Sequence, residues 1–117
     1  MKAVLLVSHG SRSPQTEEEV RKLVKVLKHQ SGIGIFEYAF LEITAPSIPE
    51  GLEICFEKGA AEIVVLLNFL NSGRHVNEDI PKIVQEFKVK HPQALVKISP
   101  PVGQHKEIVN LFLNMIP

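Results

Sequence analysis

The sequence of 117 residues contains one cysteine and no tryptophan. A single cysteine cannot form an intramolecular disulfide, and the C-x-x-C and H-E-x-x-H patterns of common zinc sites are absent. The cysteine, Cys55, occupies an apolar position in a helical pattern. We therefore expect it to be a buried, reduced thiol without a role in chemistry.

An excess of charge and a long apolar run are also missing. Lys plus Arg and Asp plus Glu number 13 each, which favours neither a nucleic-acid partner nor a membrane surface. The apolar run Ala3–Val7 is too short for the hydrophobic region of a signal peptide, and no run approaches the ~20 residues of a membrane helix. We expect a cytoplasmic protein with one domain spanning residues 1–117.

What the sequence does contain is an alternation of strand patterns and helix patterns. Short apolar runs predict strands at Ala3–Val7, Ile35–Glu42, Ile63–Leu67 and Leu95–Ile98. Helices are expected after caps at Ser13, Ser47 and Asp79, with a last helix at Glu107–Met115. The third strand is the most apolar and is expected at the centre of the sheet. Four alternations predict an α/β fold, a three-layer domain with a four-stranded parallel sheet flanked by helices.

Three of the five histidines fall in loops beyond the expected carboxyl ends of strands, where parallel sheets bind ligands: His9, His75 and His105. Two imidazoles facing one cavity can ligate Co²⁺, Ni²⁺ or Fe²⁺, and they leave coordination positions open for a metal that is handed on. Imidazoles titrate near pH ~6.5 and can also accept protons. The alternative for each is a structural role in its loop. The other two, His29 and His91, lie late in helices, and we expect them to be surface residues without a special role.

Other polar residues are expected at the same edge of the sheet. Glu42 ends the second predicted strand and is a candidate metal ligand or proton acceptor, or else an exposed carboxylate. Ser11, Arg12 and Arg74 offer hydrogen bonds and positive charge to an anionic ligand, although arginines are common in surface loops. Gly73 gives the third loop the flexibility to approach a ligand.

At these residues the sequence resembles the short, single-domain sirohydrochlorin cobalt or nickel chelatases of the small CbiX type. These are relatives of the larger class II chelatases, which include ferrochelatase. The resemblance runs over almost the whole chain. It rests on residues 5–12 (L-L-V-S-H-G-S-R), on 40–42 followed by 45–49, on 69–70 through 73–75 to 79–81, and on the closing loop 100–103 (P-P-V-G).

The resemblance implies a chelatase-like fold and a lyase that inserts Co²⁺ or Ni²⁺, with Fe²⁺ as a third candidate, into a sirohydrochlorin-type tetrapyrrole. With cobalt, this would be a step of cobalamin biosynthesis. It implies that His9 and His75 are the catalytic, metal-binding pair, that Glu42 assists them, and that the metal is a substrate, with no permanently bound cofactor. Short members resemble half of a two-lobed chelatase, so a homodimer is expected. The last helix is apolar on more than one side, which fits burial against a second copy or, alternatively, within its own domain.

Two other functions remain open. A histidine-dependent phosphoryl-transfer enzyme would use His9 as nucleophile, with Arg12 and Arg74 around the phosphate. However, no arginine directly precedes His9, as in the R-H-G signature of histidine phosphatases. A non-catalytic metal-binding or tetrapyrrole-binding protein would bind the same ligands without accelerating metal insertion.

Overall fold

Four parallel strands form one sheet in the computed structural model, which describes all 117 residues. The strands are β1 (Lys2–Ser8), β2 (Ile35–Phe40), β3 (Glu62–Leu67) and β4 (Leu95–Pro101). Their order across the sheet is β2-β1-β3-β4, and every neighbouring pair is parallel. The predicted four-stranded parallel sheet is therefore confirmed, with the apolar third strand in an interior position.

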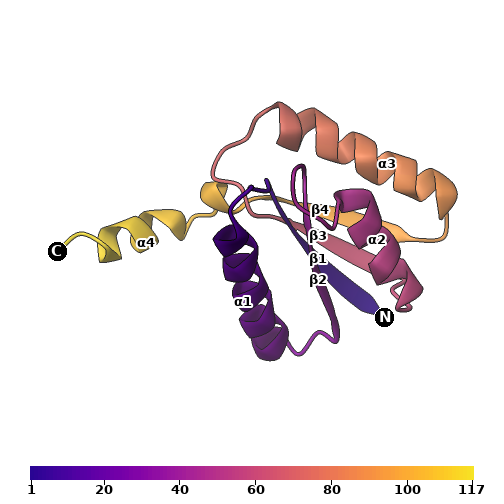
Figure 1. Cartoon of the computed structure of the whole chain (residues 1–117), viewed down its shortest axis with the longest axis horizontal. Helices are drawn as coiled ribbons and strands as arrows, with labels where there is room; N and C mark the ends of the chain where they lie inside the picture. The colour runs from indigo at the N-terminus through magenta and orange to yellow at the C-terminus, as the bar shows by residue number, and fades with distance from the viewer.

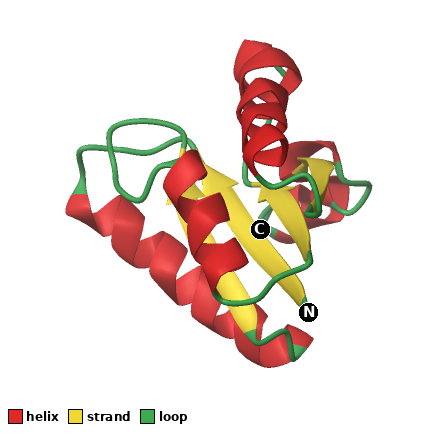
Figure 2. Ribbon diagram, turned by 90° about the vertical axis from the view of Figure 1, so that its right-hand side faces the viewer, coloured by secondary structure: helices red, strands yellow, loops and turns green.

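Helices cover the two faces of the sheet unequally (Figures 1 and 2). The helices are α1 (Pro14–Ser31), α2 (Ile48–Glu57), α3 (Ile80–Lys90) and α4 (Ile108–Asn114). The larger apolar core joins one face of the sheet to α2 and α3, through residues such as Leu5, Leu52 and Phe87. The smaller core joins the other face to α1, through Val20 and Phe40.

The strand order reverses between β1 and β3, which places the expected ligand-binding point at the carboxyl ends of these two strands. A polar contact joins the strands there. The side-chain amide of Asn68, just after β3, donates to the hydroxyl of Ser8 over 3.0 Å, and the backbone N–H of Asn68 donates to the carbonyl of Val7. Ser8 is the buried polar side chain nearest to His9 in sequence, and no buried side-chain N or O atom lacks a hydrogen-bond partner.

Two strand ends differ from the prediction. β2 ends at Phe40 rather than Glu42. Beyond it the N–H of Leu41 donates to the carbonyl of Ser8, the last residue of β1, and that of Glu42 donates to the carbonyl of His9, in the loop after β1. β4 continues to Pro101, so Pro100 and Pro101 extend the strand instead of forming a loop. A strand can hold these prolines because β4 lies at the edge of the sheet, where missing donors break no ladder on the open side.

The helix starts follow the sequence to different degrees. At α2 the predicted cap at Ser47 is present and forms a capping box, with Ser47 and Glu50 bonded in both directions. Ser13 stands at the start of α1, but its hydroxyl makes no capping bond. Asp79 does not cap α3, because a π-helical turn at His75–Asp79 already runs into the helix and Asp79 has helical dihedral angles.

His91 was expected at the surface without a special role, and the structure shows otherwise. Its ring packs against both Phe56 and Phe87, with centroid distances of 4.1 and 4.8 Å. Its Nε2 atom is 2.7 Å from a carboxylate oxygen of Glu53. The prediction was wrong because it considered only the favourable interaction of a histidine with the dipole of its own helix. It did not take into account the side chains of the neighbouring helix α2. His91 joins α2 to α3.

The last helix does not pack into its own domain. The protein measures 50 × 32 × 29 Å along its principal axes, and α4 projects from one end of the longest axis (Figure 1). None of its residues is buried. The sequence allowed burial of this helix against a second copy or within its own domain. The second of these alternatives is wrong. No helix combines the length and the apolar character needed to cross a membrane.

Candidate functional site

His9 and His75 meet at the carboxyl edge of the sheet. His9 comes from the loop after β1, and His75 from the π-helical turn before α3. Their ring centroids are 5.6 Å apart, and the ring planes make an angle of 73°. The two side chains are 49% and 47% exposed, so both rings can be reached by a ligand. Two residues 66 positions apart in sequence are therefore brought into contact by the fold.

Asp79 holds the ring of His75 from the same turn. One carboxylate oxygen of Asp79 lies 2.7 Å from Nδ1 of His75. An ionised carboxylate can only accept, so Nδ1 carries the proton and Nε2 carries the lone pair. This is the arrangement in which an outer carboxylate orients a ligating imidazole. The sequence alone did not identify Asp79 as this partner, although the spacing of four residues is one that a helix brings together.

Glu42 holds the ring of His9 from the neighbouring loop. A carboxylate oxygen of Glu42 lies 3.1 Å from Nε2 of His9, and Glu42 is 51% exposed. Backbone hydrogen bonds fix this approach, because the N–H of Leu41 donates to the carbonyl of Ser8 and that of Glu42 donates to the carbonyl of His9. The structure thus brings Glu42 to the histidine pair, from a loop position rather than from a strand end.

The two loops approach so closely that Gly10 is required between them. A Cβ atom at Gly10 would lie 1.9 Å from the carbonyl oxygen of Glu42, and Gly10 has a φ of 110°. Ile43, on the other side of Glu42, has a φ of 70°, which is rare for a β-branched residue. A glycine with positive φ in one loop and a strained Ile43 in the other accompany the placement of Glu42 beside His9.

The candidate anion-binding residues Ser11 and Arg12 lie in a separate open depression of about 450 Å³. Neither histidine of the pair lines it. Thr44 connects its two walls, since the hydroxyl of Thr44 accepts from the N–H of Ser11 and donates to the carbonyl of Ser11. The depression adjoins the first turn of α1, where the helix dipole favours negative charge.

The other two candidates, Gly73 and Arg74, begin the turn that carries His75. The carbonyl of Gly73 accepts from the N–H of Asn77, and no neighbouring atom prevents a side chain at Gly73. Arg74 is 81% exposed and forms an ion pair with Glu78 over 3.2 Å. Both therefore stand next to the histidine pair, but the structure does not require a glycine at position 73.

No group of three or more His, Cys, Asp and Glu side chains is arranged to hold a metal ion. The site consists of two imidazoles, each with one carboxylate contact. Two imidazoles alone are an incomplete set of ligands for a metal ion. The third histidine of this edge, His105, does not join the pair. Its Nδ1 atom accepts from the N–H of Glu107, and its ring lines a groove on the α1 side of the sheet.

These features define a parallel α/β domain with a paired-imidazole site at the carboxyl edge of its sheet. Comparison with protein families agrees with this class and identifies the family. The model of the CbiX family matches residues 3–117, and the chain belongs to this family.

The chain is similar to curated relatives named for sirohydrochlorin chelation. It is 33% identical over 116 residues to the sirohydrochlorin ferrochelatase of Priestia megaterium, covering 99% of this chain and 44% of that protein. It is 34% identical over 113 residues to the sirohydrochlorin cobaltochelatase of the same organism, covering 96% and 36%. The chain therefore spans less than half the length of these relatives.

The fold is that of a solved chelatase. The sirohydrochlorin chelatase SirB from Bacillus subtilis subspecies spizizenii in complex with cobalt matches with a TM-score of 0.88 and 28% identity. The match covers 97% of this chain and 48% of that one. A CbiX protein from Marinobacter aquaeolei matches with a TM-score of 0.83 at 20% identity, over 99% of this chain and 92% of that one, which shows the shared fold.

Proposed function

We propose that the protein is a chelatase that inserts a divalent metal ion into a sirohydrochlorin-type tetrapyrrole, with His9 and His75 as metal ligands. The observation that carries the proposal is the pair of accessible imidazoles 5.6 Å apart, each contacted by a carboxylate. Carboxylates beside both rings favour a cation between them and disfavour a phosphate. The same observation therefore argues against the phosphoryl-transfer alternative.

In this proposal the residues of the site divide the work of metal insertion. The lone pair on Nε2 of His75, set by Asp79, takes the metal, and His9 contributes the second imidazole. Two protein ligands leave coordination positions for the ring nitrogens of the tetrapyrrole. Insertion of a divalent ion releases two pyrrole protons, and the imidazoles and the carboxylate of Glu42 are the acceptors in reach.

Arg12, Ser11 and Arg74 are proposed to bind the carboxylates of the tetrapyrrole. The depression around Ser11 and Arg12 combines a guanidinium group with the amino end of α1, and both favour an anion. Arg74 would have to exchange its exposed pairing with Glu78 for a substrate carboxylate, which costs little because exposed ion pairs are weak. Gly73 begins this turn without steric contacts, and no further role is proposed for it.

Co²⁺ or Ni²⁺ is the proposed metal, acting as substrate, and no permanent cofactor is needed. Imidazole ligands suit both ions, and they also suit Fe²⁺. The names of the relatives include both cobaltochelatase and ferrochelatase, and the solved chelatase from Bacillus subtilis subspecies spizizenii contains cobalt. We further propose that two copies assemble, because a tetrapyrrole needs a cavity with more than one wall.

The proposal is tested by an anaerobic absorbance assay of the purified protein with sirohydrochlorin and Co²⁺, Ni²⁺ or Fe²⁺ in turn. The wild type is expected to accelerate the spectral change of metal insertion with at least one ion, and a His9→Ala, His75→Ala double variant is expected not to. A spectral change upon binding, with no acceleration for any metal, would instead support the non-catalytic binding protein.

A further inference from the structure

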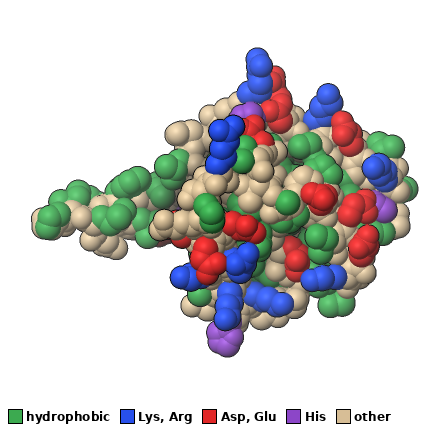
Figure 3. All heavy atoms as spheres, viewed as in Figure 1, with side chains coloured by type: hydrophobic (Ala, Val, Ile, Leu, Met, Phe, Trp, Pro, Cys, Tyr) green, Lys and Arg blue, Asp and Glu red, His purple; other side chains and the backbone are tan.

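The turn that carries His75 is wound more widely than the helix that follows it. The N–H of Ile80 donates to the carbonyl of His75, five residues earlier, where an α-helix would use the carbonyl four residues earlier. Arg74 and Ile80, on either side of the turn, have ordinary α-helical dihedral angles. The turn and α3 are therefore one continuous helix that begins with a single π-helical turn. The turn is unburied, and charged and histidine side chains lie together on the surface over the beginning of α3 (Figure 3).

Pro81 stands inside this continuous helix, because helical residues precede it from Arg74 onward. A proline inside a regular α-helix has no N–H to donate, and its ring meets the carbonyl four residues earlier, here that of Asn77. By contrast, Pro49 in α2 comes soon after the cap Ser47, which has an extended backbone, so no helical turn precedes it. Of these two prolines, only Pro81 has to be accommodated within a helix.

We infer that Pro81 causes the π-helical turn and thereby directs His75 towards His9, which makes Pro81 a positioning residue of the histidine pair. A turn closed over five residues is wider and moves the preceding carbonyl groups away from the proline ring. It also contains one residue more than an α-helical turn. If the turn became α-helical, the residues before it would rotate by about 100° and shift by about 1.5 Å relative to α3. The ring of His75 would then leave the ring of His9, from which it is now 5.6 Å distant between centroids.

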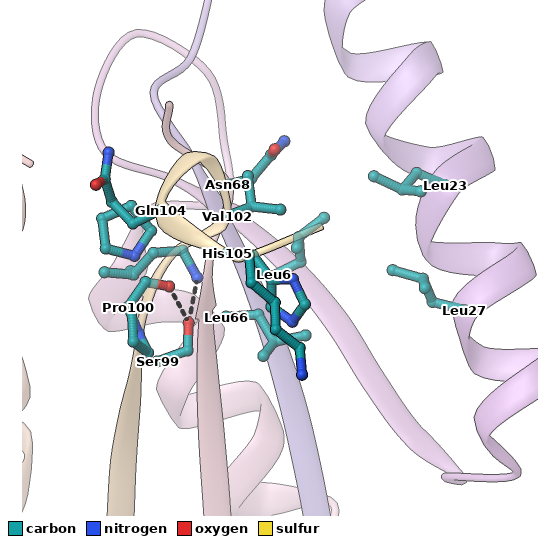
Figure 4. A pocket seen from close by; sticks show the side chains of 13 residues that line it. Leu6, Leu23, Leu27, Leu66, Asn68, Ser99, Pro100, Val102, Gln104 and His105 are labelled. Carbon is teal, nitrogen blue, oxygen red and sulfur yellow. Dashed lines mark hydrogen bonds between the residues drawn. The ribbon is translucent and has the colours of Figure 1, made fainter. Parts of the chain in front are cut away.

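The loop that leads to the turn is anchored at its start to the end of β4. The hydroxyl of Ser99 accepts from the N–H of Leu67 (Figure 4), and the side chain of Gln104 donates to the carbonyl of Leu70. Residues 71–73, between this anchor and the turn, are all exposed. They have room to take up the extra residue of an unwound turn. The winding at the beginning of α3 therefore decides where His75 lies.

The placement of the two rings follows from backbone geometry and does not depend on chelatase chemistry. The importance of Pro81 for metal binding, however, rests on the proposed function, in which His9 and His75 hold the metal. Ring contact in the absence of metal and binding of Co²⁺ are therefore measured separately.

Nuclear Overhauser effects between the ring protons of His9 and His75, recorded without metal, test the placement. The wild type is expected to show them, and Pro81→Ala is expected to lose them. The urea midpoint of Pro81→Ala should stay the same or rise, because alanine is favoured over proline within a helix. Pro49→Ala is the matched control, at the second position of α2, and should keep the ring contact. Ring contact that persists in Pro81→Ala, or that is absent from the wild type, would overturn the proposal.

Removing one residue from the turn gives a rescue that a merely structural role does not predict. In Pro81→Ala that also lacks the exposed Asn77, an ordinary α-helical turn would return His75 to its native direction, so the ring contact is expected to reappear. Deletion of Asn77 with Pro81 retained forces the proline into an α-helix and should lower the urea midpoint. No return of the contact in the folded double variant would overturn the positioning role.

Equilibrium dialysis with Co²⁺ measures the consequence for metal binding. The affinity of Pro81→Ala should fall by about 10- to 100-fold, as when an imidazole ligand loses its orientation, and should recover when Asn77 is also deleted. Pro49→Ala should bind as the wild type does. Unchanged affinity in Pro81→Ala despite lost ring contact would overturn the role in metal binding. If the ring contact behaves as expected but the wild type does not bind Co²⁺, the proposed function fails while the positioning of His75 by Pro81 is upheld.

Discussion

At the scale of single residues, Asp79 determines which nitrogen of His75 faces the ligand. In Asp79→Ala the ring loses the acceptor 2.7 Å from Nδ1, so tautomer and orientation are no longer fixed. Removing such an outer carboxylate typically weakens metal binding by about 10- to 100-fold. We expect the KM for the metal to rise by that factor, with a smaller change in kcat.

Two further variants distinguish positioning from a general loss of charge. Asp79→Asn should recover part of the metal affinity, because an amide oxygen can still accept from the same N–H. Glu78→Ala removes a neighbouring carboxylate that pairs with Arg74 instead, and it should leave the KM for the metal unchanged. Equal effects at positions 78 and 79 would indicate that bulk charge, and not ring orientation, explains the loss.

The two histidines themselves should affect activity far more than stability. His9→Ala and His75→Ala each remove a half-exposed side chain, so the free energy of unfolding should change by less than about 1 kcal/mol. Chelatase turnover should fall on the order of a hundredfold, since a displaced metal no longer meets the ring nitrogens. His29→Ala, at an exposed position in α1, is the control. Wild-type turnover in His75→Ala at limiting metal would disprove the two-imidazole mechanism.

Gly10 carries a prediction of its own because it allows Glu42 to reach His9. In Gly10→Ala the new methyl group would lie 1.9 Å from the carbonyl oxygen of Glu42, at a φ of 110° that alanine disfavours. The cost should exceed about 1 kcal/mol, and chelatase activity should fall with it. Gly34→Ala meets no atom within 4 Å and should change stability by less than about 0.5 kcal/mol. Urea denaturation of both variants, with the wild type, provides the measurement.

The residues of the site that could be predicted are those that follow the carboxyl ends of the parallel strands. Because carboxyl ends of parallel strands share one edge, His9, Glu42 and His75 could be expected near one another from sequence. Asp79 could not be assigned in the same way, since an aspartate before an apolar helical stripe also fits a helix cap. Whether Asp79 caps the helix or contacts His75 depends on the conformation of the preceding residues. They form a π-helical turn, which the periodicity of this sequence does not indicate.

At the scale of elements, strands were predicted correctly where burial determines their position. Their ends were predicted wrongly where contacts with loops determine them. β1 and β3 are apolar runs inside the sheet, so their positions followed from composition. The end of β2 could not be found that way, because Phe40 is still paired with Ser8 of β1, and the loop contacts that follow it, such as that from the N–H of Glu42 to the carbonyl of His9, leave no pattern in the composition. The capping box of α2 was found since its bonds join residues three apart.

The contact between α2 and α3 gives a prediction at this scale. His91→Ala removes a ring packed against Phe56 and Phe87 and a hydrogen bond to Glu53, so it should destabilise the protein by about 1–2 kcal/mol. His91→Phe keeps the ring contacts and should lose less. Activity per folded molecule should be unchanged in both, because His91 lies at the far end of α3 from His75. Thermal unfolding, compared with His29→Ala, measures the effect.

At the scale of the whole molecule, the sequence indicated that the last helix is apolar on several sides but not where it would lie. Periodicity reports which faces of a helix avoid water, and it contains no information on whether the covering surface belongs to the same chain. The apolar groove beside α1 became evident only from the strand order, since it depends on which strands α1 covers. The exposed position of α4 is thus a property of the folded chain that periodicity does not contain.

Cys55 reports on unfolding of the whole domain, and its titration provides the last prediction. The side chain is fully buried, and burial, with a smaller contribution from Glu37, raises the pKa of the Cys55 thiol to about 12. In the unfolded chain a thiol titrates near ~8.5. Below that pH both states are protonated, and the stabilising effect is complete. Between the two values only the unfolded state loses the proton, so the free energy of unfolding should fall as pH rises.

Urea denaturation between pH 7.5 and 10.5 measures this slope, and Cys55→Ala corrects for the other groups that titrate there. The difference between wild type and Cys55→Ala should shrink steadily above about pH 8.5, because only the wild-type chain gains a thiolate on unfolding. In the same samples a thiol reagent should modify Cys55 no faster than the domain unfolds. A pH-independent difference, or modification of the native protein at the rate of an exposed thiol, would mean that the core around Cys55 opens without global unfolding.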